Sequence, residues 1–316
     1  MGLQPLPPDL EKIHKDSLEQ VKKAQAFRSL LERAITFVSS PPRHGLYNKP
    51  GVLEVSGKGN YVFIGDLHGD YYALLSVLAN VWSDVKGGHT IVFLGDYVDR
   101  GYMQVETLSF VLNLKESLPE QTVLIRGNHE PPRSLIPHPH DYPTQLGHKF
   151  GSDGGELYDL SLALFDSFPL GVVEEGLFFA VHGGPPLNVL NKKNWREALE
   201  IGRDAFTQST IEEILWSDPT ELNVNYVPSP RGAGVLYSRF VSEKALQLIK
   251  GKIIIRAHQA VNGFEFAHNG MVVTVFTSPL VYGLDCAGTL KLEYNEVTSA
   301  HEVKTICVRP VRAIGT

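Results

Sequence analysis

The fold is decided by residues 61–130, in which three short apolar runs alternate with longer stretches of helical pattern. The runs read YVFIG at 61–65, TIVFLG at 90–95 and TVLIR at 122–126. Between them, residues 72–82 and 105–118 carry apolar side chains at helical spacing. Strands that are apolar throughout and alternate with helices are typical of parallel sheets that helices cover. The sequence therefore predicts a parallel β-α-β-α-β unit and an α/β fold.

A polar cluster follows each apolar run directly. The clusters read GDLHG at 65–69, GDYVDRG at 95–101 and RGNHE at 126–130. Ligand-binding groups in open α/β sheets gather at the carboxyl ends of neighbouring strands. We therefore expect Asp66, Asp96 and Asn128 to lie close together, although each is at least 30 positions from the next. Asp66 and His68 are two positions apart, so an extended segment would point both to one side.

The rest of the chain is richer in strand patterns. Strands are expected at 170–173, 177–181, 253–256, 264–268, 271–276, 289–294 and 301–308, a helix at 156–168, and surface loops at 133–142 and 224–234. Asn269-Gly270 is a strong hairpin signal. One or two amphipathic helices are predicted within 10–39. We therefore divide the chain into an N-terminal helical segment (1–45) and one mixed α/β domain (46–316).

The composition narrows the class of protein. The chain has 316 residues, 43% hydrophobic and 20% charged, so it can bury a core without a disulfide framework. With 29 basic and 35 acidic residues its net charge is −6, which indicates no nucleic-acid partner. Only Cys286 and Cys307 are present, so we expect neither disulfide stapling nor a four-cysteine zinc site. We see no signal peptide or membrane span, and expect a cytoplasmic protein without a membrane partner.

Two further histidines follow apolar runs of the second half. His182 comes after 177–181, and His258 comes after 253–256. The candidate metal ligands are then Asp66, His68, Asp96, Asn128, His182 and His258. Mixed imidazole and carboxylate ligands suit manganese, iron or zinc better than magnesium or calcium. Six ligands exceed what one tetrahedral ion needs, and they suit two ions that share a carboxylate, the usual machinery for hydrolysing phosphate esters.

Each motif alone also has a structural explanation. A Gly-Asp turn after a strand is common, and a lone histidine more often packs in a core or lies on the surface. The set is different, because Asp, His, Asp, Asn and His at the ends of three consecutive strands form a group that no fold needs for stability.

The sequence resembles the PPP family of metal-dependent serine/threonine protein phosphatases, within the calcineurin-like metallophosphoesterase superfamily. The resemblance is carried by GDLHG, GDYVDRG, RGNHE, HGG (182–184), LWSDP (215–219), RG (231–232) and RAHQAV (256–261). It implies a central β-sandwich of mixed sheets flanked by helices, of the metallophosphoesterase type. It also implies hydrolysis of phosphomonoesters on a phosphoprotein or phosphopeptide, by a water or hydroxide that bridges two metal ions. It does not indicate which regulatory subunit, if any, would bind.

The resemblance implies a role for each matching residue. Asp66 and His68 would hold the first metal, Asp96 would bridge, and Asn128, His182 and His258 would hold the second. The two divalent ions would be Mn²⁺ in vitro, with iron or zinc as alternatives. Arg100 and Arg231, with Asn128, would bind phosphate oxygens, and His129 with Asp99 would supply the leaving-group proton. A surface salt bridge is the other interpretation of either arginine.

Two segments depart from the family pattern. After Glu130 the chain reads PPRSLIPHPHD, where relatives carry an aromatic and acidic segment. The loop at 277–283 reads TSPLVYG in place of SAPNYCG, so Tyr282 either stands one position late or is not equivalent to the family's tyrosine, and the loop cysteine is absent.

Three alternatives remain open at this point. A nucleotide phosphoesterase, such as a diadenosine-polyphosphate hydrolase, belongs to the same superfamily. A catalytically inactive scaffold would be expected to have lost part of the site, whereas every position is filled here. His138, His140 and His148 could bind an extra metal, or they could simply belong to a proline-broken loop.

Overall fold

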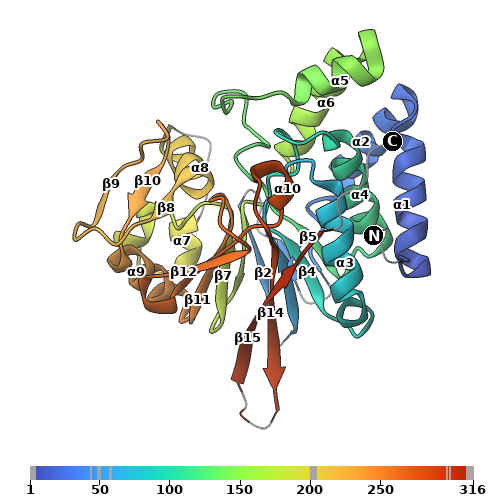
Figure 1. Ribbon diagram of the computed structural model, residues 1–316. Helices are drawn as coiled ribbons and strands as arrows, with labels where there is room; N and C mark the ends of the chain where they lie inside the picture. Colours follow the sequence, from blue (N-terminus) through green and yellow to red (C-terminus); the bar gives the residue numbers. More distant parts are fainter. Residues whose placement is uncertain are drawn as a thin grey trace.

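Two β-sheets pack face to face in the computed structural model, and helices cover the outer face of each (Figure 1). The structure describes residues 5–42, 45–47, 51–56, 59–199, 205–296, 298 and 300–310. The order of layers is helices, sheet, sheet, helices. Three hydrophobic cores separate these layers, one between the sheets and one under each group of helices. This arrangement confirms the expected α/β fold with a central β-sandwich of mixed sheets.

The first sheet contains the predicted parallel unit. Its strands, in spatial order, are β15 (Ala300–Val308), β14 (Ala287–Asn295), β3 (Tyr61–Ile64), β4 (Thr90–Phe93) and β5 (Thr122–Leu124). β3, β4 and β5 are parallel, while β14 runs antiparallel to both β3 and β15. α3 (Tyr71–Lys86) and α4 (Gln104–Ser117) form the two crossovers. The predicted β-α-β-α-β order is confirmed.

The second sheet is built mainly from the second half of the chain. Its order is β1 (Gly45–Tyr47), β2 (Val52–Val55), β6 (Gly171–Glu174), β7 (Phe178–Val181), β11 (Ile253–Arg256), β13 (Val272–Val275) and β12 (Phe264–Ala267). β12 and β13 pair antiparallel across Asn269 and Gly270, which both have positive φ, so the predicted hairpin is confirmed. β1 and β2 were not predicted from the sequence.

Alternation along the strands explains why their sequences are apolar throughout. In β3, Phe63 enters the core between the two sheets, whereas Val62 and Ile64 enter the core beneath the helices. In β4, Val92 faces the other sheet and Ile91 faces the helices. Since successive side chains of a strand point to opposite faces, a strand covered on both sides needs apolar residues at every position.

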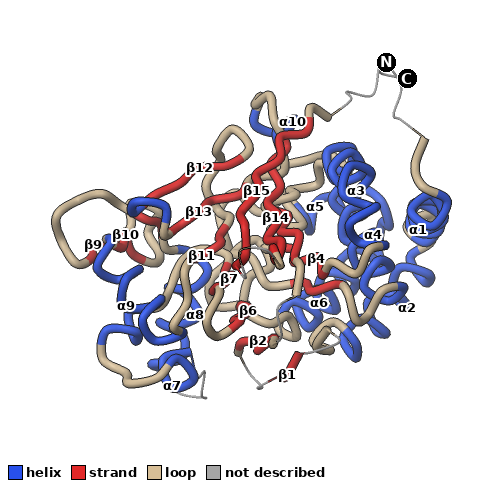
Figure 2. Tube along the Cα trace, turned by 90° about the horizontal axis from the view of Figure 1, so that it is seen from below, coloured by secondary structure: helices blue, strands red, loops and turns tan. Residues whose placement is uncertain are grey.

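The N-terminal residues form two helices. α1 (Pro8–Gln20) and α2 (Ala24–Phe37) lie beside α4 on the outer face of the first sheet, with α5 (Tyr142–Phe150), the 3₁₀ turn η1 (Gly151–Asp153) and α6 (Gly154–Phe165) nearby (Figure 2). Leu10 and Phe27 are fully buried in the core that also contains α3 and α4. The boundary at residue 45 stays a prediction.

The remaining elements cover the second sheet and the strand ends. They are η2 (Leu187–Leu190), α7 (Trp195–Leu199), α8 (Ala205–Trp216), β8 (Asp218–Pro219), β9 (Tyr226–Pro228), β10 (Val235–Tyr237), α9 (Arg239–Ile249), η3 (His268–Gly270) and α10 (Pro279–Tyr282). The prediction of a loop over 224–234 was wrong in part, because β9 pairs with β10. β9 lies at the edge of a small sheet with Tyr226 and Pro228 exposed, so it lacks the apolar pattern of a covered strand.

One covalent link was not expected from the sequence. Cys286 and Cys307 form a disulfide bond, because the antiparallel pairing of β14 with β15 brings their Cα atoms to 5.4 Å. Within the described residues, no helix combines the length and the apolar character needed to cross a bilayer.

Candidate active site

Hydrogen bonds join the loops that follow β3, β4 and β5. The Asp96 carbonyl accepts from the amides of Leu67 (2.9 Å) and His68 (2.8 Å). The buried Glu130 carboxylate accepts from the amides of Asp96 (2.7 Å) and Tyr97 (2.8 Å), so the third loop holds the second. The three polar clusters therefore lie together at the strand ends, as expected.

Backbone strain is concentrated in the same place. Positive φ angles occur at His68 (43°), Asp96 (56°), Asp99 (66°), Arg100 (74°) and His258 (71°). Unfavourable backbone conformations of this kind cost of order 1–3 kcal/mol each and persist only where the surroundings impose them. Gly127 shows how tight the surroundings are, because a Cβ there would lie 2.2 Å from Asp96 Oδ1. Strain that clusters in this way is typical of functional sites.

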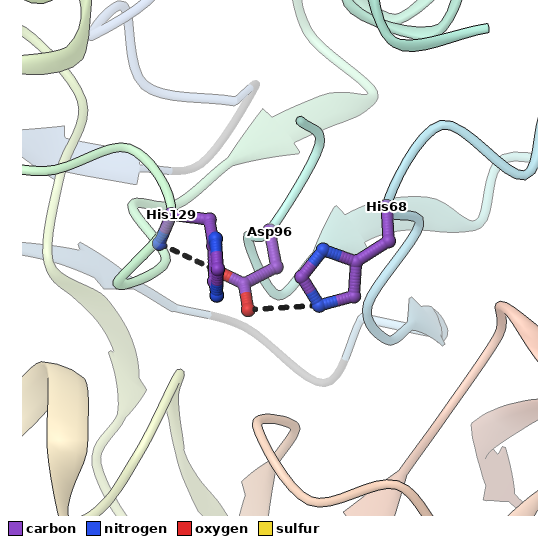
Figure 3. Close-up of side chains that lie close together, drawn as sticks. All are labelled: His68, Asp96 and His129. Carbon is purple, nitrogen blue, oxygen red and sulfur yellow. Dashed lines mark hydrogen bonds and ion pairs between the residues drawn. The ribbon is translucent and has the colours of Figure 1, made fainter. Parts of the chain in front are cut away.

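Asp66 and Asp96 are buried, and in each carboxylate one oxygen accepts from a backbone amide while the other faces the candidate histidine ligands. Asp66 Oδ1 accepts from the His258 amide at 2.9 Å, and Asp96 Oδ1 accepts from the His129 amide at 2.8 Å. Asp96 Oδ2 lies 3.4 Å from His68 Nε2 (Figure 3). It also lies 3.4 Å from His182 Nε2, so it stands between the two halves of the ligand set. Asp96 thus has the position that a bridging ligand needs.

Backbone carbonyls orient two of the imidazoles. His68 Nδ1 donates to the Val98 carbonyl (2.9 Å), and His182 Nδ1 donates to the Leu94 carbonyl (2.7 Å). A carbonyl can only accept, so Nδ1 carries the proton in both rings and Nε2 faces the centre. Outer hydrogen bonds of this kind are typical of metal-binding histidines.

Asn128 joins the second group of candidate ligands. Its Oδ1 lies 2.9 Å from His182 Nε2 and 2.8 Å from His258 Nδ1. The structure therefore brings all six predicted ligands together, with Asp66 and His68 on one side, Asn128, His182 and His258 on the other, and Asp96 between them.

Burial and neighbouring charges shift the pKa values of the candidate ligands. Burial and the charge of Asp96 raise the pKa of Asp66 to about 6. Burial would also raise the pKa of Asp96, but the adjacent His182 and His129 hold it well below its usual range. Burial lowers the pKa of His68 to about 4, so its Nε2 lone pair is available at neutral pH. In addition, the buried Nε2 of His258 has no hydrogen-bond partner within the described part of the chain. This donor set suits transition-metal ions.

His129 and Asp99 form a close pair beside that centre. His129 Nδ1 lies 2.5 Å from Asp99 Oδ2, and both side chains are buried. Burial alone would lower the pKa of His129, but the negative charges of Asp96 and Asp99 raise it above its ordinary value. The pair thus has the geometry and the charge that a general acid needs near neutral pH.

A cavity of about 230 Å³ lies above these groups, and both predicted arginines line it. The Arg100 amide donates to Asp141 (3.0 Å) and its side chain is exposed. Arg231 Nε donates to Asp218 Oδ2 at 2.6 Å, so this arginine forms an ion pair and still lines the cavity. Asn128 and His129 line the same cavity.

Tyr282 also reaches the site. Its ring lies 5.9 Å from the ring of His68, and it lines the cavity from α10. The buried Asp70 carboxylate holds this turn, because it accepts from the amides of Ala73 at the start of α3 (3.2 Å) and of Leu280 in α10 (2.9 Å). The one-position shift in sequence therefore does not remove the ring from the site.

Some residues of the site were not identified from the sequence. Asp218 and Arg256 lie in quoted motifs but had received no role, and Arg256 Nη2 donates to Asp218 Oδ1 at 2.9 Å. His140 lies 2.6 Å from Asp99. In the sequence it does not adjoin an apolar strand or helix pattern that would have predicted this position. His138 lines the cavity, and within the described residues His138, His140 and His148 do not form a shared cluster.

The chain is similar to one known protein family and to several known proteins. A family profile described as calcineurin-like phosphoesterase matches residues 59–262. A "Probable serine/threonine-protein phosphatase" of Encephalitozoon cuniculi is 28% identical over 94% of this chain and 63% of its own length. A "PP2A-like" serine/threonine-protein phosphatase of Candida albicans is 36% identical over 68% of this chain and 51% of its own length. The chain thus matches roughly half to two thirds of these curated relatives.

A solved structure shares the fold. A protein serine/threonine phosphatase from Saccharomyces cerevisiae, described as similar to human phosphatase PP5, matches with a TM-score of 0.70 at 22% identity. The match covers 92% of this chain and 91% of the other.

Proposed function

The chain belongs to the calcineurin-like phosphoesterase family, and from this premise we propose that it is a metal-dependent protein phosphatase acting on phosphoserine and phosphothreonine. One observation carries the proposal: both arginines, His129 and four of the six candidate metal ligands (His68, Asp96, Asn128 and His258) line one small cavity. Directly behind them, Asp66, His182 and Asp99 contact His258, Asp96 and His129. The two curated relatives are named as serine/threonine phosphatases, which supports a phosphoprotein substrate rather than a dinucleotide.

We assign the metal ligands as the sequence suggested them. Asp66 and His68 would hold one ion, Asn128, His182 and His258 the other, and Asp96 would contribute to both. When bound, divalent ions would lower the pKa of water and neutralise phosphate charge. Mn²⁺ is the proposed ion in vitro, with iron and zinc as alternatives, because imidazole and carboxylate donors suit these metals.

Arg100 and Arg231 would bind the phosphate. A guanidinium offers planar, charge-assisted hydrogen bonds that match two phosphate oxygens. Arg231 keeps its orientation through Asp218, which accepts from Nε and leaves the two terminal nitrogens for substrate. Asn128 would add an amide donor, since its Oδ1 already faces His182 and His258.

His129 would protonate the leaving oxygen of the serine or threonine. An alkoxide is a poor leaving group, so a positioned acid accelerates its departure. Asp99 binds Nδ1, and the other ring nitrogen, Nε2, would deliver the proton. The raised pKa of His129 favours the protonated ring that this role requires.

The proposal is tested with a panel of substrates after metal removal. The protein is stripped with a chelator and assayed with Mn²⁺, Mg²⁺, Zn²⁺ or Fe²⁺ on phosphoserine, phosphothreonine and phosphotyrosine peptides and on a dinucleotide polyphosphate. We expect no activity in the stripped protein and Mn²⁺-restored turnover of the phosphoserine and phosphothreonine peptides. Full activity after stripping would rule out the metal mechanism, and preferential turnover of phosphotyrosine or of the dinucleotide would overturn the substrate assignment.

A further inference from the structure

We propose that His140 is a positioning residue for the leaving-group proton: it holds the Asp99 carboxylate in the orientation that His129 requires. The proposal rests on the proposed function of the His129–Asp99 pair. It concerns the segment after Glu130, where the sequence departs from the PPP pattern.

The Asp99 carboxylate is shared between two imidazoles. Asp99 Oδ2 lies 2.5 Å from His129 Nδ1 and 2.6 Å from His140 Nδ1. An ionised carboxylate can only accept hydrogen bonds, so both rings donate to the same oxygen. Asp99 is fully buried, and a buried carboxylate that lost one donor would lose part of what keeps it ionised and in place.

The residues that follow His140 bind the other oxygen of Asp99. Asp99 Oδ1 accepts from the amides of Asp141 and Tyr142, each at 2.9 Å. The chain segment 140–142 therefore supplies three of the four donors that surround this carboxylate, and His129 supplies the fourth. A carboxylate with four fixed donors cannot rotate without breaking hydrogen bonds.

Tyr158 fixes the orientation of His140. The Tyr158 hydroxyl lies 2.9 Å from His140 Nε2. With the His140 proton on Nδ1, Nε2 is an acceptor, and the hydroxyl donates to it. The result is a continuous chain of hydrogen bonds from Tyr158 on α6 through His140 to the Asp99 oxygen that also binds His129. Since this chain does not depend on the ring carrying a charge, it holds the orientation of Asp99 even when His140 is neutral.

Asp141, which follows His140, also binds the turn that carries Arg100. Asp141 Oδ1 accepts from the Arg100 amide (3.0 Å), and Asp141 Oδ2 accepts from Gln104 Nε2 (3.1 Å). By contrast, the cavity is lined by Pro137 and His138 of this loop and not by His140. His140 therefore acts behind Asp99, without a place at the substrate, which is why we call it a positioning residue.

Substrates with good and poor leaving groups distinguish this positioning role from a general structural role. A phosphoserine peptide needs a proton on its leaving oxygen, whereas an aryl phosphate with a good leaving group needs little help. A variant that only disturbs His129 should therefore slow the peptide much more than the aryl phosphate. A variant that damages the metal centre or the fold should slow both equally.

The experiment compares His140→Phe with His140→Asn in the full chain with Mn²⁺. His140→Phe removes the donor and should lower kcat for phosphoserine peptide ~10–100-fold, a part of the ~10²–10⁴-fold that general acid catalysis contributes, while kcat for the aryl phosphate changes less than ~3-fold. His140→Asn can place an amide N–H near the former Nδ1 and should recover most of the loss. His148→Phe, which alters an exposed histidine of α5, is the matched control and should leave both rates unchanged.

Two further measurements complete the test. In an Asp99→Asn background, His140→Phe should add no further loss, because the group it acts through is already altered. If His140→Phe does not fold, Tyr158→Phe should shift the peptide-to-aryl ratio in the same direction, with His140→Asn as the variant that keeps the ratio near that of the wild type. Equal losses on both substrates, or full additivity with Asp99→Asn, would overturn the proposal. If the wild type does not cleave phosphopeptides, the proposed function fails, and alkyl and aryl phosphates then give the ratio for His140 independently.

Discussion

Asp99 and Asp218 lie on opposite sides of the site, and each holds two basic side chains. Asp99 follows β4 of the first sheet and binds the imidazoles of His129 and His140. Asp218 follows α8 beside the second sheet and binds the guanidiniums of Arg231 (2.6 Å) and Arg256 (2.9 Å). Both carboxylates are buried. The two carboxylates have similar surroundings, but their partners differ in one chemical respect.

That difference decides what each carboxylate can do. An imidazole gains or loses a proton near neutral pH, whereas a guanidinium stays protonated in proteins. Burial would raise the pKa of Asp99, but the hydrogen bonds of His129 and His140 outweigh it and lower the pKa well below its usual range. Asp99 can thus stabilise a proton that moves during the reaction. Asp218 can only orient charges that never change, which suits phosphate binding and stability.

The largest effect is expected at the centre that the two sides share. Asp96→Asn should abolish turnover of every substrate, by ~10³-fold or more, since it removes the proposed shared ligand and its charge. Metal content per protein should fall in parallel, as measured by elemental analysis. Retention of both ions with normal activity would show that Asp96 does not hold them.

The Asp99 side is tested next by His129→Asn. Turnover of phosphoserine peptides should fall ~10²–10⁴-fold, the usual range for a lost general acid. An aryl phosphate should be affected much less, because its leaving group needs no proton. Kinetics on both substrates measure the ratio, and equal losses would make His129 a structural residue or a metal partner.

The Asp218 side should respond in stability rather than in leaving-group dependence. Arg256 is fully buried, and its guanidinium also donates to the Gly183 carbonyl (2.7 Å) and to Gln259 (2.6 Å). Arg256→Met should lower the free energy of unfolding by about 3–5 kcal/mol, because it leaves Asp218 as a buried charge with one partner fewer. Denaturant unfolding monitors this loss. If stability is unchanged while the peptide-to-aryl ratio shifts, the contrast between the two carboxylates does not hold.

The smallest effect is expected for Arg231→Lys. Lysine keeps the charge but loses the planar fork, so the loss should be that of a charged hydrogen bond, about 1.5–3 kcal/mol. This corresponds to ~10–150-fold in kcat/KM, equally for peptide and aryl phosphate. Inhibition by inorganic phosphate should weaken by a similar factor. A loss confined to the peptide would instead connect Arg231 with the leaving group.

The two sides also differ in how far the sequence predicted them. Asp99, Arg100 and His129 stand in motifs that follow predicted strands, so the sequence alone predicts that they meet. Arg231 was expected at the phosphate, but its ion pair with Asp218 was not. β8, β9 and β10, which carry this side, are short and have no clear alternation, so sequence pattern gave no reason to bring 218 and 231 together.

By itself the sequence determined the parallel unit, the hairpin at Asn269-Gly270 and the convergence of the six candidate ligands. The physical reason is local: apolar runs of strand length must be covered on both faces, and their carboxyl ends then share one edge. Only the tertiary structure decided that His140 binds Asp99 across 41 positions and that Tyr282 lies over His68. Such contacts join loops whose paths depend on the packing of α5, α6 and α10, and no periodicity in the sequence records that packing.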